Sequence, residues 1–360
     1  MRLDVHLGVL TGPADLDRID LAVLAEELGF GTVWTAESYG SDAVSVLAAV
    51  AGRTSRIGLG TAVLQIPARS AAMTAMTAAT LDLLSGGRLK LGLGVSGPQV
   101  SEGWHGVPFA APLARSREYV DVVRAALRGD LVTAAGPHIR LPLPGGEGKP
   151  LRLRLHPVRP EVPIYLAAVG DRSIALTREI AHGWLATGVP AERIRAVLDR
   201  PARAEAAGAG DGDAGPGPDR PARPGPFDVV VELQVVVGDE VEECAGRLRD
   251  RAAMTLGGMG SRTTNFYRAA AAALGFAVEV AEVEARFAAG DRAGAAAAVP
   301  LDYLDQTALL GPVQRIAGRM REYAAAGAGS LCLMLSGHAD GRLVMEQAAR
   351  AYRLSGVGGG

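Results

Sequence analysis

Residues 57–94, IGLGTAVLQIPARSAAMTAMTAATLDLLSGGRLKLGLG, contain one complete strand–helix–strand repeat. The stretch begins and ends with short apolar runs of strand length, and residues 68 to 84 between them predict a helix. The glycine pair at 86 and 87 ends that helix and turns the chain. Two apolar strands joined through a helix by short links predict neighbouring parallel strands, the unit of an α/β sheet.

The same alternation runs through most of the chain. Strand-like apolar runs recur at residues 3–10, 32–35, 57–63, 89–93, 162–168, 184–186, 228–237 and 330–335. Strands that alternate with helices in this number predict an α/β fold of the (β/α)₈ TIM-barrel type, and 360 residues is an ordinary length for one such domain. An open doubly wound sheet is the alternative. It requires a glycine-rich dinucleotide turn after the first strand, and GVLTGP at residues 8–13 does not match one.

Three segments interrupt the rhythm of this single predicted domain, residues 1–360. Residues 131–160 hold short apolar strings and glycine turns, which predict a hairpin excursion. Residues 204–226 consist almost wholly of Gly, Ala, Pro, Asp and Arg and predict a disordered loop, because they cannot bury enough apolar surface to offset the entropy of ordering. Residues 258–299 predict a helical insertion. The strand expected at 228–237 argues against a domain boundary before it.

Composition excludes several classes of protein. The formal net charge is −2, which argues against the basic face of a nucleic-acid binder and against general attraction to acidic membranes. The two cysteines, Cys244 and Cys332, give neither a disulfide framework nor zinc spacing, and no metal site is predicted. The first residues lack the apolar stretch of a signal peptide, and no run is long enough to span a membrane. We therefore expect a cytoplasmic protein.

In a parallel barrel the chemistry lies in the loops that follow the strands. The loop after the second strand holds Glu37, Ser38 and Tyr39, although turn and capping roles also suit such residues. Small residues after the third strand, among them Ala62 and Val63, would let a flat ligand approach the backbone. Further candidates follow the first, fourth and fifth strands: His6; Gly94, Val95, Ser96, Gly97, Gln99 and His105; Ala168, Val169, Gly170 and Arg172. The last four open a helix, whose N-terminal amides attract phosphate.

Taken in order, these segments resemble the luciferase-like superfamily, and within it the F420-dependent branch that includes methylenetetrahydromethanopterin reductase. The segments that carry the resemblance are GTVWTAESYGSDA at residues 31–43, TSRIGLGT at 54–61, LLSGGR at 83–88, GLGVSGPQV at 92–100, EGWHG at 102–106, IYLAAVG at 164–170, and GMGS at 258–261 with NFY at 265–267. The likeness covers nearly the whole chain apart from residues 204–226.

The resemblance implies a deazaflavin, coenzyme F420, held across the strand ends, with FMN as the alternative cofactor. It implies a cis peptide between Ala62 and Val63 that backs the cofactor ring. The glycine-rich loop from 94 to 99 and the turn from 168 to 172 match the regions that hold the cofactor side chain and phosphate. Glu37 and Ser38 match positions beside the ring. Relatives are commonly dimers, so the resemblance also implies a homodimer.

The sequence departs from the sugar-phosphate dehydrogenases of this branch. Those enzymes carry a histidine at the position of Ser38 and an acid in the loop after the fourth strand, where this chain has Val95-Ser96. Because a serine does not titrate near neutral pH, the proton donor is not identified. Tyr39, Glu102 and His105 are the candidates. The residues predicted to be catalytic are Glu37, Ser38, Tyr39 and His105, and the other residues named above at the strand ends are predicted to contact the cofactor.

Three functions follow from this reading. The first is an F420-dependent oxidoreductase that transfers a hydride and reduces an activated C=C or C=N bond in a natural-product or pterin-like small molecule. The second is a monooxygenase that uses reduced FMN on the same fold. The third is a non-catalytic cofactor-binding barrel, which the missing histidine would favour.

Overall fold

The computed structural model describes residues 1–360 except 156–157, 160, 201–225, 262–264, 336–339 and 359–360. The predicted disordered loop, residues 204–226, therefore lies almost wholly outside the described residues. Among the residues that are described, no helix is both long and apolar enough to cross a membrane.

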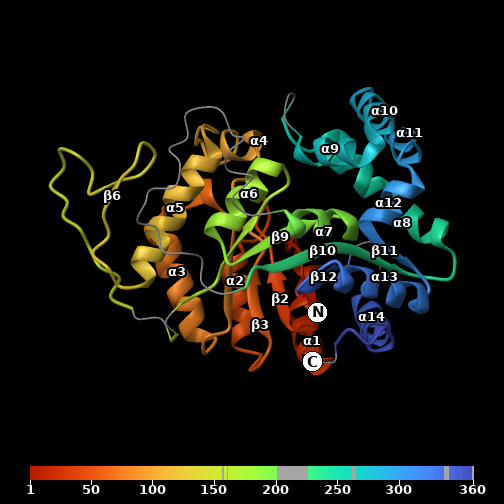
Figure 1. Ribbon diagram of the computed structural model, residues 1–360, viewed down its shortest axis with the longest axis horizontal. Coiled ribbons are helices and arrows are strands. Elements are labelled where there is room, and N and C mark those ends of the chain that lie inside the picture. The colour runs from red at the N-terminus through yellow and green to blue at the C-terminus, as the bar shows by residue number, and fades with distance from the viewer. Residues whose placement is uncertain (156–157, 160, 201–225, 262–264, 336–339, 359–360) are drawn as a thin grey trace.

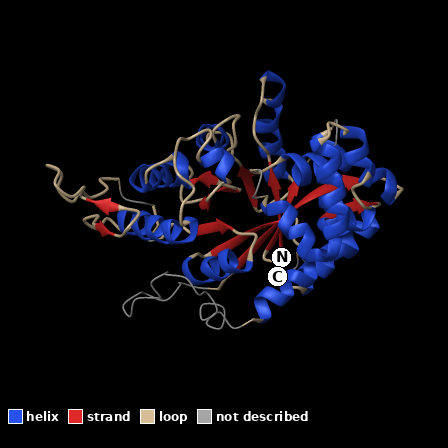
Figure 2. Ribbon diagram, turned by 90° about the horizontal axis from the view of Figure 1, so that it is seen from above, coloured by secondary structure: helices blue, strands red, loops and turns tan. Residues whose placement is uncertain are grey.

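Eight parallel strands close into a barrel, which confirms the predicted fold. Each strand pairs with the next in the order β12-β1-β2-β3-β5-β8-β9-β10, and β10 pairs in turn with β12, so the ring has no open edge. Figure 2 shows the strands gathered in the middle of the molecule with helices outside them. The barrel strands are β1 (Arg2–His6), β2 (Thr32–Thr35), β3 (Gly58–Thr61), β5 (Leu89–Gly94), β8 (Ile164–Ala167), β9 (Gly183–Thr187), β10 (Asp228–Val237) and β12 (Ser330–Met334).

The outer helices pack their apolar sides on this barrel. Those that follow barrel strands are α1 (Asp17–Glu27), α2 (Ala43–Ala51), α3 (Ala71–Leu84), α4 (Pro98–Ser101), α5 (Pro112–Leu127), α6 (Asp171–Ile180), α7 (Ala191–Asp199), α8 (Val241–Ala253) and α14 (Gly341–Ser355), and α13 (Val313–Ala325) precedes the last barrel strand. Side-chain caps begin several of them, as Asp42 does for α2 by accepting from the Ser45 amide at 2.7 Å. The two termini lie side by side, and the Met1 ammonium donates to the Val357 carbonyl (Figure 1).

Large and small side chains alternate inside the barrel. Trp34 on β2 faces Gly60 on β3, where an added Cβ would lie 2.2 Å from the indole ring. Tyr165 stacks edge-on against Trp34, with ring centroids 5.6 Å apart. Such filling makes the lower barrel a packed core and leaves the carboxyl ends of the strands for binding.

The two described excursions lie on different sides of the barrel (Figure 1). Within residues 131–160, β6 (Ala134–Ala135) and β7 (Arg140–Leu141) pair antiparallel. The described part of residues 254–307 is mainly helical: α9 (Phe266–Ala271), α10 (Ala277–Ala288), α11 (Arg292–Ala297) and α12 (Leu301–Thr307), with π-helical turns at Met254–Gly258 and Ala272–Phe276. A second small core unites these helices with α8.

Two details differ from the sequence prediction. The first strand ends at His6 rather than residue 10, because Gly8 takes a left-handed conformation (φ +76°) and the following residues turn across the barrel mouth. The strand β11 (Ala308–Gly311) was not predicted. It pairs with the last residues of β10, outside the ring of eight, and leads into α13.

Candidate active site

A cavity of about 1680 Å³ opens at the carboxyl ends of the barrel strands. Small-molecule pockets usually measure about 300–1,000 Å³, so this one has room for a large ligand and a second molecule. All the predicted cofactor contacts line it, and so do three of the four predicted catalytic residues. These lining residues are His6, Glu37, Ser38, Tyr39, Ala62, Val63, Gly94, Val95, Ser96, Gly97, Gln99, Ala168, Val169, Gly170 and Arg172.

A backbone bulge between β3 and the short strand β4 (Leu64–Gln65) forms one wall. The Ala62–Val63 peptide is cis, which confirms what the family resemblance implied. Regular pairing between β3 and β5 stops at Gly60, and Thr61 continues the connection through its side chain. Its hydroxyl donates to the Gly92 carbonyl at 2.7 Å and accepts from the Gly92 amide at 2.8 Å. These two hydrogen bonds hold the bulge in place although its backbone no longer pairs with β5.

Glycine is required beside this bulge. An added Cβ at Gly94 would lie 2.5 Å from Cγ2 of Val63, which is closer than real contacts. Two residues later, Ser96 adopts a left-handed conformation with φ of 59°. Such a backbone is uncommon for a residue other than glycine and is concentrated at functional sites. The missing side chain at Gly94 and the left-handed turn at Ser96 both let the backbone of this loop lie close to the cavity.

The turn from Ala168 to Ser173 forms a second wall and begins α6. The buried indole of Trp184 donates to the Ala168 carbonyl at 2.8 Å and fixes the turn from below. The first residues of α6, Asp171 to Ser173, line the cavity, so an anion bound beside them would meet the positive end of the helix. The carboxylate of Asp171 would repel such an anion, but its ion pairs with Arg193 and Arg200 offset this repulsion.

Glu37 lies in the wall but has no free carboxylate oxygen. Arg69 binds it with two hydrogen bonds, at 2.5 and 2.6 Å. The amides of Ala43 and Gln65 also donate to it, each at 3.3 Å. Its side chain is 7% exposed. These contacts tie the loop after β2 to the segment after the bulge, so the geometry favours a positioning role and the predicted catalytic role stays a prediction.

The other candidates for proton transfer lie in less favourable places. Tyr39 is 68% exposed at the rim. His105 does not line the cavity: its Nε2 lies 2.6 Å from Oε1 of Gln65, which it helps to hold in place. The carboxylate of Glu102 accepts from the Phe109 amide at 3.0 Å and closes its own loop. Ser38 lines the cavity but cannot supply a proton near neutral pH, so none of the four is a convincing acid.

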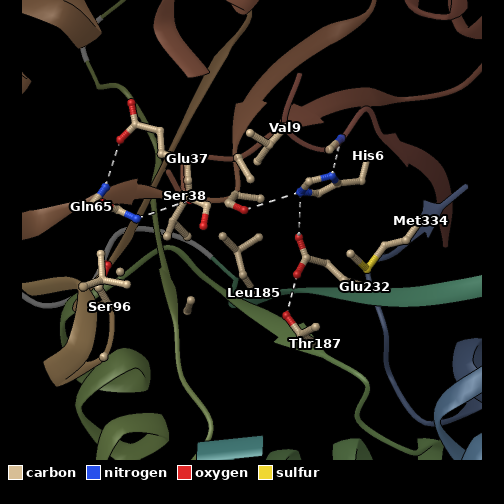
Figure 3. Close-up of a pocket in the computed structure, with 18 of the residues that line it drawn as sticks. His6, Val9, Glu37, Ser38, Gln65, Ser96, Leu185, Thr187, Glu232 and Met334 are labelled. Carbon is tan, nitrogen blue, oxygen red and sulfur yellow. Dashed lines mark hydrogen bonds and ion pairs between the residues drawn. The ribbon is translucent and has the colours of Figure 1, made fainter. Parts of the chain in front are cut away.

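The structure adds two residues that the sequence analysis missed, Glu232 on β10 and Thr187 on β9 (Figure 3). The Thr187 hydroxyl donates to Oε2 of Glu232 at 2.5 Å. Oε1 lies 3.9 Å from Nε2 of His6, which also lies 3.4 Å from the Ala62 carbonyl. The signal in the sequence was one glutamate inside the apolar run DVVVELQVVV, at residues 228–237.

A model of luciferase-like monooxygenases matches residues 6–330. This chain belongs to the luciferase-like monooxygenase family. A member from Mycobacterium tuberculosis, named as a coenzyme F420-dependent oxidoreductase, is 39% identical over 94% of this chain and 96% of its own length. A 5,10-methylenetetrahydromethanopterin reductase from Methanolobus tindarius is 35% identical over 46% of this chain and 48% of its own. The family predicted from the sequence is confirmed.

Solved structures share the fold of this chain. The coenzyme F420-dependent tetrahydromethanopterin reductase from Methanopyrus kandleri superposes with a TM-score of 0.76 over 97% of both chains, at 19% identity. An F420-dependent secondary alcohol dehydrogenase superposes with a TM-score of 0.75 over 99% of both, at 16% identity. At these identities the likeness concerns the barrel alone.

Proposed function

We propose that this protein is a coenzyme F420-dependent oxidoreductase. The observation that carries the proposal is the relative from M. tuberculosis, which is named as such an enzyme and is similar over nearly the full length of both chains. The F420-dependent glucose-6-phosphate dehydrogenases among the partial matches are named for the same cofactor.

The cavity suits a large, flat and anionic cofactor. The bulge at Ala62 and Val63, with Gly94 behind it, offers a flat backing for a ring system. The amides at the start of α6, together with Arg172, offer donors for a phosphate. Ser96 lines the same cavity and would contact the cofactor there.

When bound, reduced F420 supplies a hydride from its central ring. We infer that the protein uses it to reduce an activated C=C or C=N bond in a natural-product or pterin-like substrate. Phe109 and Phe266 contact each other at the cavity, with centroids 6.3 Å apart, and Met254 and Met259 lie on the same insertion side. This apolar side favours a substrate with a largely apolar body, and burial there would exclude water from the reacting bond.

Titration of the purified protein with F420 and with FMN, followed by the fluorescence of each, tests the cofactor. We expect binding of F420 at micromolar concentrations and at least about tenfold weaker binding of FMN, a difference of about 1.4 kcal/mol. Tight binding of FMN without binding of F420, together with oxygen consumption by the reduced FMN complex, would replace this proposal with the monooxygenase alternative.

A further inference from the structure

Glu232 is a buried carboxylate of the cavity lining, and one of its oxygens has no hydrogen-bond partner among the described residues. The residue is 6% exposed. Its Oε2 accepts a hydrogen bond from Thr187, whereas Oε1 has no hydrogen-bond partner among the described residues. Buried polar atoms in proteins are nearly always satisfied, so an oxygen left without a partner on a residue that lines a cavity indicates that a bound water or ligand completes its contacts.

The neighbouring histidine leaves that oxygen available. The amide of Gly8 donates to Nδ1 of His6 at 2.8 Å, so the neutral ring carries its proton on Nε2. Nε2 is 3.9 Å from Oε1 of Glu232, which is beyond hydrogen-bond distance. Figure 3 shows the imidazole and the carboxylate facing each other across this gap at the cavity wall. His6 therefore orients and electrostatically supports the carboxylate without occupying its free lone pairs.

We propose that Glu232 is the acid–base residue of this site. The proposal rests on the function proposed above. Reduction of a C=C or C=N bond adds a hydride, with both electrons, to one atom and a proton to the other. Glu232 supplies that proton: its O–H bond breaks, the electron pair stays on the carboxylate, and a new C–H or N–H bond forms on the substrate. Solvent then returns a proton to the carboxylate, and in the oxidative direction each transfer is reversed.

The surroundings distinguish Glu232 from the other carboxylate in the wall. Glu37 is bound by the guanidinium of Arg69, which would hold it as an acceptor throughout the reaction. Thr187, by contrast, has a neutral hydroxyl that can donate to a carboxylate or accept from a carboxylic acid. Only a neutral partner of this kind suits both states of a group that gains and loses a proton.

A comparison of three variants tests the role by kinetics. Glu232→Gln removes the proton but keeps the shape, Glu232→Asp keeps the proton at a shorter reach, and Glu243→Gln removes an exposed carboxylate of α8 as a control. Each is titrated with F420 by fluorescence. Each is then mixed, with reduced F420 bound, with 2-cyclohexen-1-one as an activated alkene in single-turnover experiments.

We expect all four proteins to bind F420 within about threefold of one another. Because general acid catalysis typically contributes about 10²–10⁴-fold, Glu232→Gln should slow the single-turnover step by at least about 100-fold. Glu232→Asp should retain part of the rate and Glu243→Gln all of it. Turnover by Glu232→Gln within about threefold of wild type would overturn the assignment. Failure of the wild type to bind F420 would instead remove the proposed function.

A second measurement does not depend on turnover and decides the matter if the probe alkene does not react. Infrared difference spectra are recorded as the pH is lowered, for wild type and Glu232→Gln, with and without F420. The titratable groups that face Glu232 are His6 on β1, Tyr267 on α9 and Cys332 on β12. None of them has a carboxyl band. We expect a protonated-carboxyl band that the Gln variant lacks and that shifts when F420 binds, and its absence throughout the folded range would refute the proposal.

Discussion

Replacing Arg69 with methionine should destabilise the protein by leaving Glu37 as a buried carboxylate without its cation. Breaking a buried ion pair from one side costs about 3–5 kcal/mol. Glu37 would keep two long amide hydrogen bonds, so we expect the lower end, about 3 kcal/mol. Unfolding entropy of about 2.1 cal/mol/K per residue gives about 0.76 kcal/mol/K for 360 residues, so the melting temperature should fall by about 4 °C.

Equilibrium unfolding in urea measures this change, with two comparison variants. Glu37→Met/Arg69→Met removes both charges and should recover much of the loss, because no unpaired charge remains buried. Arg128→Met breaks an exposed pair with Asp130, whose side chains are 55% and 48% exposed, and should cost less than about 1 kcal/mol. The reasoning is refuted if Arg69→Met costs no more than Arg128→Met, or if the double variant Glu37→Met/Arg69→Met is no more stable than Arg69→Met alone.

Three further substitutions probe other parts of the framework. Desolvation raises the pKa of Glu26, but amide hydrogen bonds from residues 55–57 outweigh it and lower the pKa to about 2, below the value in the unfolded chain. The difference in free energy of unfolding between wild type and Glu26→Gln should therefore be full above about pH 5 and shrink as the pH falls toward 2. A difference that is constant with pH would contradict this. Gly94→Ala places a methyl group against Val63, so it should lower the free energy of unfolding by about 1–3 kcal/mol and weaken F420 binding. Unchanged binding in a fluorescence titration would show that Val63 moves aside without disturbing the site. Trp184→Phe leaves the Ala168 carbonyl without its donor, so urea unfolding should show a loss of about 1–3 kcal/mol, and no loss would mean that water replaces the indole.

The barrel could be predicted from the sequence because its strands are short apolar runs with helices between them. The strand β11, at residues 308–311, was missed because it follows α12 directly in the sequence. It has only four residues, ALLG, which suit a helix equally well. The end of β1 was misplaced for a related reason. The apolar residues Val9 and Leu10 continue the pattern of the strand, but a left-handed glycine at position 8 redirects them into the loop.

The residues proposed to contact the cofactor, in the bulge after β3, the loop after β5 and the turn after β8, could be placed at one cavity from the sequence because they follow consecutive barrel strands and form recognisable local segments. The roles of residues whose partners lie elsewhere in the chain could not be predicted from the sequence. Nothing near Glu37 in the sequence indicates that Arg69 neutralises it, and nothing near His105 indicates that its ring faces Gln65 rather than the cavity. Glu232 was visible as a charge inside an apolar strand, but the alternation of a strand does not tell whether such a charge faces a cavity, a salt bridge or solvent.

Closure of the barrel explains why the proposed acid–base side is the less predictable half of the site. The cofactor wall comes from β3, β5 and β8, which are neighbours in both sequence and space. The opposite side joins His6 on the first strand to Thr187 and Glu232 on β9 and β10, which meet it only because the ring closes through β12. Substitutions on that side can change proton transfer while the cofactor wall is retained.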